Sequence, residues 1–327
     1  MKPVNFFYSE PDPDRWFKFD RYPRQVIRRI IRGKPRPGGV MQAAMNLIRG
    51  FQLLGIPFRY NDYSYINKHP GEIACILGKP HLIFQYAWKN PIIFGPGTFS
   101  HPIEYPDIFE RYPNIQRIVV FGEWMKKMFQ PAYGKKVMAS PVGTDTQYWD
   151  IKNKSLQFDF LIYDKIRWNY AEKEDELLNP LKEKLLTNNV SFHTIKYGWY
   201  THEELLSKLK VSKAVIFLCE HETQGLAYQQ ILATNTPILA WDRGGYWQDP
   251  YYYPDKVVYG PVSSVPYWDE RCGMKFKSAD DFNDQLMRFL TRLQEFKPRQ
   301  YIMENLTLEK CAEKYLEIYQ EVQRDLK

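Results

Sequence analysis

The strongest constraint on the fold is a regular alternation of short apolar runs, rich in β-branched residues, with longer amphipathic stretches. This alternation is typical of α/β proteins, in which amphipathic helices cover parallel sheets. In the first half of the chain we expect strands at residues 4–8, 57–60, 91–94 and 118–121, and helices at 40–54 and 123–129. In the second half we expect strands at residues 158–163, 214–218 and 237–241, and helices ending near 186, opening at 201 and spanning 224–234, 279–293 and 308–325.

The pattern breaks once, at residues 141–150 (PVGTDTQYWD), where proline, glycine, threonine and aspartate follow one another without periodicity. We interpret this break as a domain boundary. The expected domains are residues 1–148 and 149–327, with the last helix crossing back to the N-terminal domain. A length of 327 residues fits two domains of ordinary size, and two Rossmann-like domains are the leading architecture.

Composition indicates a globular protein without membrane spans. The chain is 44% hydrophobic, yet its longest apolar runs, such as residues 214–219, are far too short to cross a bilayer. The N-terminus has no apolar core or cleavage site of a secretory signal. Four widely spaced cysteines predict free thiols that fill core space, and a reducing cytoplasm is the expected setting.

The net charge of +7 favours anionic partners. Nine basic residues, interleaved with aromatic ones, lie between Arg15 and Arg36. Such a stretch suits a membrane interface or a nucleic-acid backbone, and a solvated surface helix is equally compatible with it. We expect peripheral membrane contact through Arg15–Arg36 and regard nucleic acid as the less favoured partner.

The segment from residue 219 to 245 carries the clearest functional pattern. A buried strand ends in a polar loop (CEHETQ), and a helix begins near Gly225. Ligands of parallel sheets bind at the carboxyl ends of the strands, and a helix N-terminus suits a diphosphate. Glu222 and Gln230, eight residues apart, are placed to bind hydroxyl groups. The alternative is that Glu222 only complements the helix dipole and Gln230 is solvated.

This segment resembles the donor-binding motif of the retaining GT-B glycosyltransferases in the large glycogen-synthase-like family. Their pattern is Glu-x-x-Gly-Leu, a second Glu eight residues after the first, and a strand ending near Gly-Gly. The chain matches it with Glu222, Gly225-Leu226 and Gly244-Gly245, while Gln230 replaces the second Glu. Further segments that resemble the family, in the same order, are Gly38-Gly39-Val40, residues 118–127 and residues 142–146.

The resemblance implies a fold and a set of site residues. The fold is α/β, with two Rossmann-like domains facing each other across a cleft. Glu222 would lie at the donor sugar, and His101 in the N-terminal domain beside the reacting sugar. His101 would otherwise be a structural histidine. The residues expected to bind the donor are Lys165 and Arg167 at the diphosphate, Gln230 at the ribose, and Gly39, Gly225 and Leu226.

The implied function is transfer of a sugar from a nucleoside-diphosphate sugar to a glycan or lipid-linked acceptor, with retention and without metal. No cofactor is expected, because the nucleotide sugar is itself a substrate. Asp12-Pro13-Asp14 resembles an Asp-x-Asp metal motif but is interpreted as a turn, and the histidines lack metal-ligand spacing. Two alternatives remain: a nucleotide-sugar epimerase of the same fold, or a basic protein that binds or glucosylates nucleic acid.

Overall fold

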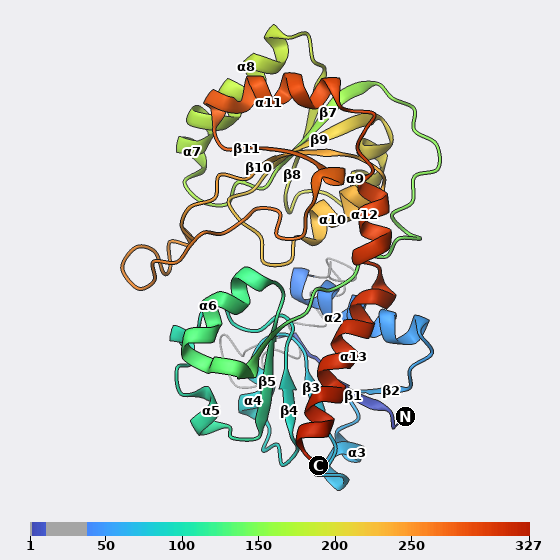
Figure 1. The fold of residues 1–327 in the computed structure, drawn as a ribbon, viewed down its shortest axis with the longest axis vertical. Coiled ribbons are helices and arrows are strands. Elements are labelled where there is room, and N and C mark those ends of the chain that lie inside the picture. Colours follow the sequence, from blue (N-terminus) through green and yellow to red (C-terminus); the bar gives the residue numbers. More distant parts are fainter. Residues whose placement is uncertain (1, 11–37) are drawn as a thin grey trace, which may run out of the picture. The chain divides into compact units, whose positions relative to one another are not determined.

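The computed structural model describes residues 2–10 and 38–327 and divides into two compact units (Figure 1). Among the described residues, the first unit comprises 2–10, 38–121, 129–143 and 311–327, and the second comprises 122–128 and 144–310. The stretch Arg15–Arg36 and the Asp12-Pro13-Asp14 triplet lie outside the described residues.

The first unit is built on a parallel six-stranded sheet among the residues described, in the order β2-β1-β3-β4-β5-β6. The strands are β1 (Val4–Phe7), β2 (Phe58–Tyr60), β3 (Ala74–Ile76), β4 (Ile92–Phe94), β5 (Ile115–Val120) and β6 (Val137–Ala139). Its helices are α2 (Gly39–Leu53), α3 (Tyr63–Lys68), α4 (His81–Gln85) and α5 (Ile108–Arg111), with short 3-10 turns at Pro102–Glu104 and Gly134–Lys136. Helix α6 (Glu123–Tyr133) is shared, since residues 123–128 are assigned to the second unit and residues 129–133 to the first.

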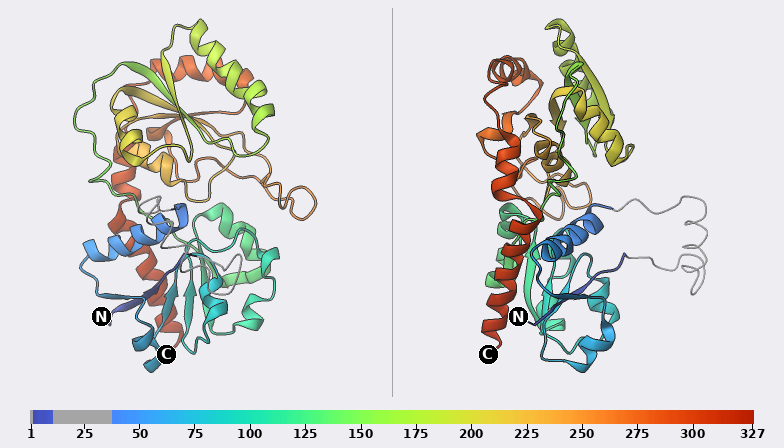
Figure 2. Two further views of the ribbon diagram at one scale, coloured as in Figure 1. Left: turned by 180° about the vertical axis from the view of Figure 1, so that it is seen from behind. Right: turned by 90° about the vertical axis from the view of Figure 1, so that its right-hand side faces the viewer.

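One face of this sheet is covered by helices from opposite ends of the chain. α2 and the C-terminal helix α13 (Leu308–Asp325) pack on β1 and β3 in one hydrophobic cluster. Figure 2 shows α13 lying along this sheet. Tyr315 of α13 is fully buried, contacts the rings of Phe6 and Phe51 at centroid distances of 6.1 and 6.3 Å, and donates a hydrogen bond to the Gly95 carbonyl. The last helix therefore completes the core of the first unit.

The second unit holds a parallel sheet of five described strands in the order β11-β10-β9-β7-β8. The strands are β7 (Phe158–Asp164), β8 (Phe192–Lys196), β9 (Ser212–Leu218), β10 (Ile238–Trp241) and β11 (Gly273–Phe276). A helical stretch made of α7 (Tyr170–Lys173), a π-helical turn (Glu174–Leu178) and α8 (Asn179–Thr187) follows β7. The remaining helices are α9 (His202–Lys210), α10 (Leu226–Ala233), α11 (Ala279–Thr291) and α12 (Pro298–Asn305), with a 3-10 turn at Glu270–Cys272.

α8 and α11 cover one face of the second sheet, where Phe160, Ile216 and Phe282 share a buried cluster (Figure 1). α10 packs against the sheet through Tyr228, whose ring lies 5.8 Å from that of Phe217 in β9. Helices on both faces explain why β7 and β9 are nearly continuous apolar runs.

The fold class predicted from the sequence is confirmed, since both sheets are parallel and flanked by helices. The predicted strands and helices are present, with ends shifted by a few residues. Four strands were not predicted: β3 and β6 have only three residues each, and β8 and β11 lie at the sheet edges with half-polar sequences. The edge strands β8 and β11 lack the apolar run by which a buried strand is recognised, whereas β3 lies in such a run (IACIL, residues 73–77) that was not assigned to a strand.

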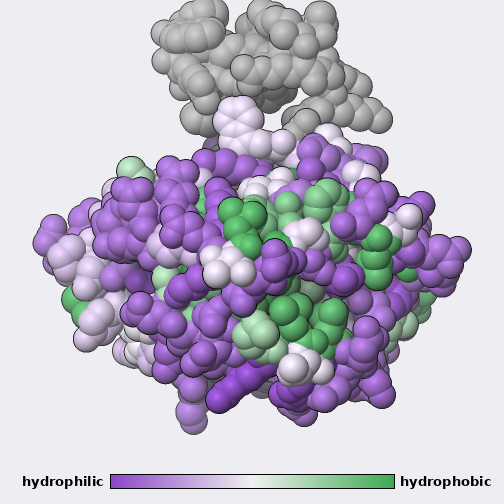
Figure 3. All heavy atoms as spheres, turned by 90° about the horizontal axis from the view of Figure 1, so that it is seen from above, coloured by the Kyte–Doolittle hydropathy of each residue, from purple (hydrophilic) through white to green (hydrophobic). Residues whose placement is uncertain are grey.

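Within the part of the chain that the structure describes, no helix is both long and apolar enough to cross a membrane. All four cysteines lie in this part, and each is free and buried. Figure 3 shows a mainly hydrophilic face with small groups of apolar side chains.

Substitutions of Tyr315 test whether α13 completes the core of the first unit. Tyr315→Ala should lower the free energy of unfolding by about 3–5 kcal/mol, because it leaves a cavity beneath α13. Tyr315→Phe keeps the ring and loses one hydrogen bond, so the free energy of unfolding should fall by only about 1 kcal/mol. Urea unfolding monitored by circular dichroism would measure both values, and equal losses in the two variants would contradict the packing described.

Candidate functional site

The loops after β7 and β9 meet at the carboxyl edge of the second sheet through a buried ion pair. Lys165 follows β7, Glu222 lies in the loop after β9, and the Lys165 Nζ contacts the Glu222 Oε1. The two residues are 9% and 7% exposed. Burial by itself lowers the pKa of the Lys165 ammonium, but the Glu222 carboxylate outweighs it and holds this pKa above its usual value. The two predicted residues therefore lie together, and each neutralises the charge of the other.

The ring of Tyr197, in the loop after β8, also lies beside the Lys165 ammonium. Its centroid lies 4.4 Å from the Lys165 Nζ. Backbone hydrogen bonds fix the same corner: the Lys165 amide donates to the Leu218 carbonyl at 2.8 Å, and the Glu222 amide donates to the Ser263 carbonyl at 2.9 Å. Loops that follow β7, β8, β9 and β10 therefore converge on the Lys165–Glu222 pair.

Arg167 lies beside this pair and contacts the same loop. Its guanidinium donates to the His221 carbonyl at 3.1 Å and stacks over the Trp168 ring at 4.3 Å. The Glu220 carboxylate lies 3.6 Å from the Arg167 Nε. The Oε1 of Glu220 also accepts the backbone amides of Arg167 and Trp168 at 2.8 and 3.1 Å. Glu220 thus holds the loop after β7 against the loop after β9.

His221 is a neutral residue at the centre of this cluster. Burial, together with the positive charges of Arg167, Arg243 and Lys165, lowers the pKa of its imidazole well below the usual value. The Trp247 indole N–H donates to the His221 Nε2 at 2.9 Å. Because an indole N–H only donates, Nε2 must be the acceptor, and the ring proton lies on Nδ1.

The N-terminus of α10 is shaped by Gly225, which has the left-handed φ of +77°. A Cβ at this position would lie 2.0 Å from the Tyr228 ring, so only glycine fits. Across this turn, the Gln224 Nε2 donates to the Gln229 Oε1 at 2.9 Å, and the Gln229 Nε2 donates to the backbone carbonyl of Gln224 at 2.7 Å. Leu226 is the first helical residue, and Gln230 is buried within the helix at 6% exposure.

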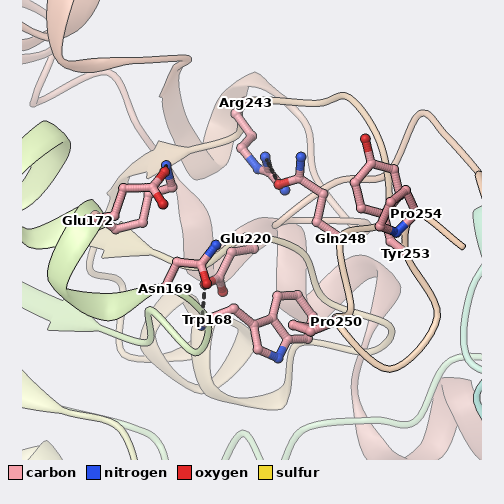
Figure 4. Close-up of a pocket in the computed structure, with 10 residues that line it drawn as sticks. Trp168, Asn169, Glu172, Glu220, Arg243, Gln248, Pro250, Tyr253 and Pro254 are labelled. Atoms are coloured by element: carbon pink, nitrogen blue, oxygen red, sulfur yellow. Dashed lines mark hydrogen bonds and ion pairs between the residues drawn. The ribbon is translucent and has the colours of Figure 1, made fainter.

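A cavity of about 390 Å³ opens at the same edge of the sheet (Figure 4). It is lined by residues of the loop after β7 and the first turn of α7, by Glu220, and by the long loop after β10. The members are Trp168, Asn169, Glu172, Lys173, Glu220, Arg243, Gln248, Pro250, Tyr253 and Pro254. The cavity therefore brings together three segments that are separate in the sequence: residues 168–173, Glu220 and residues 243–254.

The predicted residues Gly39 and His101 belong to the first unit. Gly39 begins α2, and a Cβ there would meet nothing within 4 Å, so close packing does not require this glycine. His101 caps a 3-10 turn: its Nδ1 accepts the Ile103 amide at 3.1 Å. The structure thus gives His101 a structural role, and its place beside a reacting sugar stays a prediction.

Sequence reasoning missed Glu220, His221, Arg243 and Trp247. The first two stand inside the CEHETQG loop and Arg243 stands directly before Gly244-Gly245, so the segment was recognised but these side chains were not. The charges of Glu220, inside a predicted ligand loop, and of Arg243, beside the Gly-Gly pair, were the available signal. Over the described ranges, 2–10 and 38–327, no group of three His, Cys, Asp or Glu side chains is arranged to hold a metal ion.

No protein-family model and no curated protein sequence matches this chain. Solved structures do match in fold. HepE of Anabaena in complex with UDP has a TM-score of 0.58 at 8% identity, covering 98% of this chain and 100% of that one. The lipopolysaccharide outer core galactosyltransferase WaaB, in its apo form, gives 0.56 at 10% identity, with 98% and 99% covered.

A TarM variant from S. aureus, solved with fondaparinux, α-GlcNAc-glycerol and UDP, has a TM-score of 0.53 at 18% identity. The match covers 78% of this chain but 57% of that one, so this chain spans little more than half of the length of TarM. At these identities the likeness concerns the fold. The chain has two Rossmann-like α/β units of the GT-B class.

The buried neutral His221 predicts loss of stability in acid. Its folded pKa lies below the value of about 6.5 in an unfolded chain, so protonation below pH 6.5 favours the unfolded state. His221→Gln, whose amide oxygen can replace Nε2 as acceptor, should reduce the slope of unfolding free energy against pH by up to about 1.4 kcal/mol per unit between pH 6.5 and 5.

Urea titrations over this range would measure the slope. His81, His101, His193 and His202 also have pKa values lowered by burial, so a residual slope is expected in the variant. The exposed His69→Gln serves as the control and should keep the wild-type slope. An unchanged slope in His221→Gln would contradict the neutral buried state.

Proposed function

We propose that this chain is a glycosyltransferase that moves a sugar from a nucleoside-diphosphate sugar to a glycan or lipid-linked acceptor. The observation that carries the proposal is the buried Lys165–Glu222 pair next to the N-terminus of α10. Support also comes from the fold, because HepE and the TarM variant were solved with UDP and WaaB is a galactosyltransferase.

The donor diphosphate would bind at the positive end of α10. The first amides of a helix are unpaired and attract anions. Lys165 and Arg167 add positive charge from the neighbouring loop. Negative charge grows on the diphosphate as the glycosidic bond breaks, and fixed cations in a dry site stabilise that charge. The reaction would thus need no metal ion at the diphosphate.

Glu222 would bind the hydroxyl groups of the donor sugar. A lysine ammonium has three donor hydrogens, so Lys165 can bond a phosphate oxygen while it still neutralises Glu222. The Glu222 carboxylate can then accept from a sugar hydroxyl, a strong charge-assisted bond. Gln230 would bond the ribose. We assign no carboxylate as a nucleophile, and we propose transfer with retention.

The epimerase and nucleic-acid alternatives gain no support from the structures named above. A thermal-shift screen of the chain with UDP, GDP, ADP and their sugars would identify the donor. Release of the free nucleotide in the presence of candidate glycan acceptors would then test transfer. Interconversion of the donor sugar without transfer to an added acceptor would favour an epimerase instead.

Glu222 and Gln230 should differ in their kinetic effects. Glu222→Gln should lower kcat about 100-fold or more, because a neutral amide neither balances Lys165 nor binds a hydroxyl as strongly. Gln230→Ala should raise the KM for the donor more than it lowers kcat. The exposed Glu183→Gln on α8 is the control, and wild-type turnover in Glu222→Gln would refute the assignment.

Activity should persist in excess EDTA, because Lys165, Arg167 and the α10 N-terminus supply the charge that a metal would supply elsewhere. The measurement is turnover before and after chelation, with manganese added back. Loss on chelation that manganese restores would rule out the metal-independent reaction and point to Asp12 and Asp14.

A further inference from the structure

The cavity beside Glu220 contains hydrogen-bonding atoms that the rest of the described structure leaves unused. Glu220 is 4% exposed. Its Oε1 already accepts two backbone amides, whereas its Oε2 is buried without a hydrogen-bond partner among the described residues. The Arg167 Nε, at 3.6 Å, is an ionic neighbour beyond hydrogen-bonding distance. The cavity wall therefore offers one fixed acceptor that no described group satisfies.

Arg243 contributes the complementary donors. Its Nη1 donates to the Gln248 Oε1 at 2.6 Å, which fixes the guanidinium in place. Its Nε and Nη2 are buried and, among the described residues, lack an acceptor. Buried polar atoms without partners are uncommon, and each one requires an explanation such as an absent ligand. Both side chains line the same cavity, as Figure 4 shows.

The arrangement selects against several ligands. A simple anion is disfavoured because the carboxylates of Glu220 and Glu172 line the cavity. Guanine is disfavoured because its edge needs both oxygens of a carboxylate, and the Glu220 Oε1 is occupied by two amides. A metal cation is disfavoured by Arg243 and Lys173 in the same wall.

We propose that this cavity binds a sugar ring, with neighbouring hydroxyl groups donating to the Glu220 Oε2 and accepting from Arg243. A hydroxyl group both donates and accepts, so adjacent hydroxyls match an acceptor placed opposite donors. The rings of Trp168 and Tyr253 offer apolar surface for the C–H face of the sugar, while Asn169 and Gln248 offer further polar contacts. The cavity has room for one such ring.

This inference goes beyond the proposed transfer reaction, because it concerns binding by residues other than Lys165, Glu222 and Gln230. It is therefore tested without a donor. The probes are the methyl α-glycosides of glucose, galactose and N-acetylglucosamine, and the measurements are saturation-transfer NMR and calorimetric titration. At least one glycoside should bind to the wild-type chain.

The key variant is Glu220→Gln. The glutamine oxygen can still accept the amides of Arg167 and Trp168, so the loop keeps its shape, but a donor NH₂ replaces the acceptor Oε2. Glycoside binding should weaken about tenfold or more. Arg243→Met should have a similar effect, and the exposed Glu183→Gln should have none. Melting temperatures of the variants would show that they are folded.

Three results would overturn the proposal. The first is the absence of glycoside binding to the wild-type chain at about 50 mM, well above the millimolar Kd of a weak site. The second is equal binding by the wild-type chain and by Glu220→Gln. The third is displacement of the glycoside by UDP, GDP or ADP alone, which would place a nucleotide in the cavity. Unchanged nucleotide affinity in Glu220→Gln would support the proposal. This test does not depend on whether the chain transfers sugar.

The source of the sugar ring would follow from kinetics. If the ring belongs to the acceptor, Glu220→Gln should raise the KM for the acceptor and leave that for the donor unchanged. If it belongs to the donor, the donor KM should rise instead. Either result supports sugar binding in this cavity, whereas unchanged values of both KM and kcat would overturn a role for the cavity in the reaction.

Discussion

The Lys165–Glu222 ion pair is the interaction around which the second unit organises its ligand edge. Removing two charges from water is costly, and the cost is offset only when the partners face each other with further hydrogen bonds. That requirement fixes the loop after β7 against the loop after β9. The parallel order of β7 and β9 makes the contact possible, since both strands end at the same edge of the sheet.

Glu220 extends the same constraint toward the cavity. By accepting two amides of the loop after β7, it orients Trp168 and leaves its second oxygen available. His221, bonded to Trp247 and to the Arg167 guanidinium, adds no further positive charge to those of Arg167, Arg243 and Lys165. In this cluster, hydrogen bonds hold the loops together, and some polar atoms remain to which a ligand could bond.

Much of the fold could be predicted from the sequence, because buried parallel strands and amphipathic helices have distinct periodicities. β7, β9 and α13 are clear cases. β8 could not be predicted, since this edge strand is half-exposed and its sequence (FHTIK) has no apolar run. Of the candidate site, the loop before α10 and the residues Lys165 and Glu222 could be selected, but their direct pairing could not.

By itself, the sequence determined the α/β class, the succession of two strand–helix halves and the glycine at the start of α10, since these depend on local pattern and backbone conformation. Only the tertiary structure decided that Glu222 balances Lys165 and that Glu220 and Arg243 share a cavity. These partners are 57 and 23 residues apart. Each pair is brought together because the order of the strands, which no local pattern encodes, places their loops at one edge of the sheet.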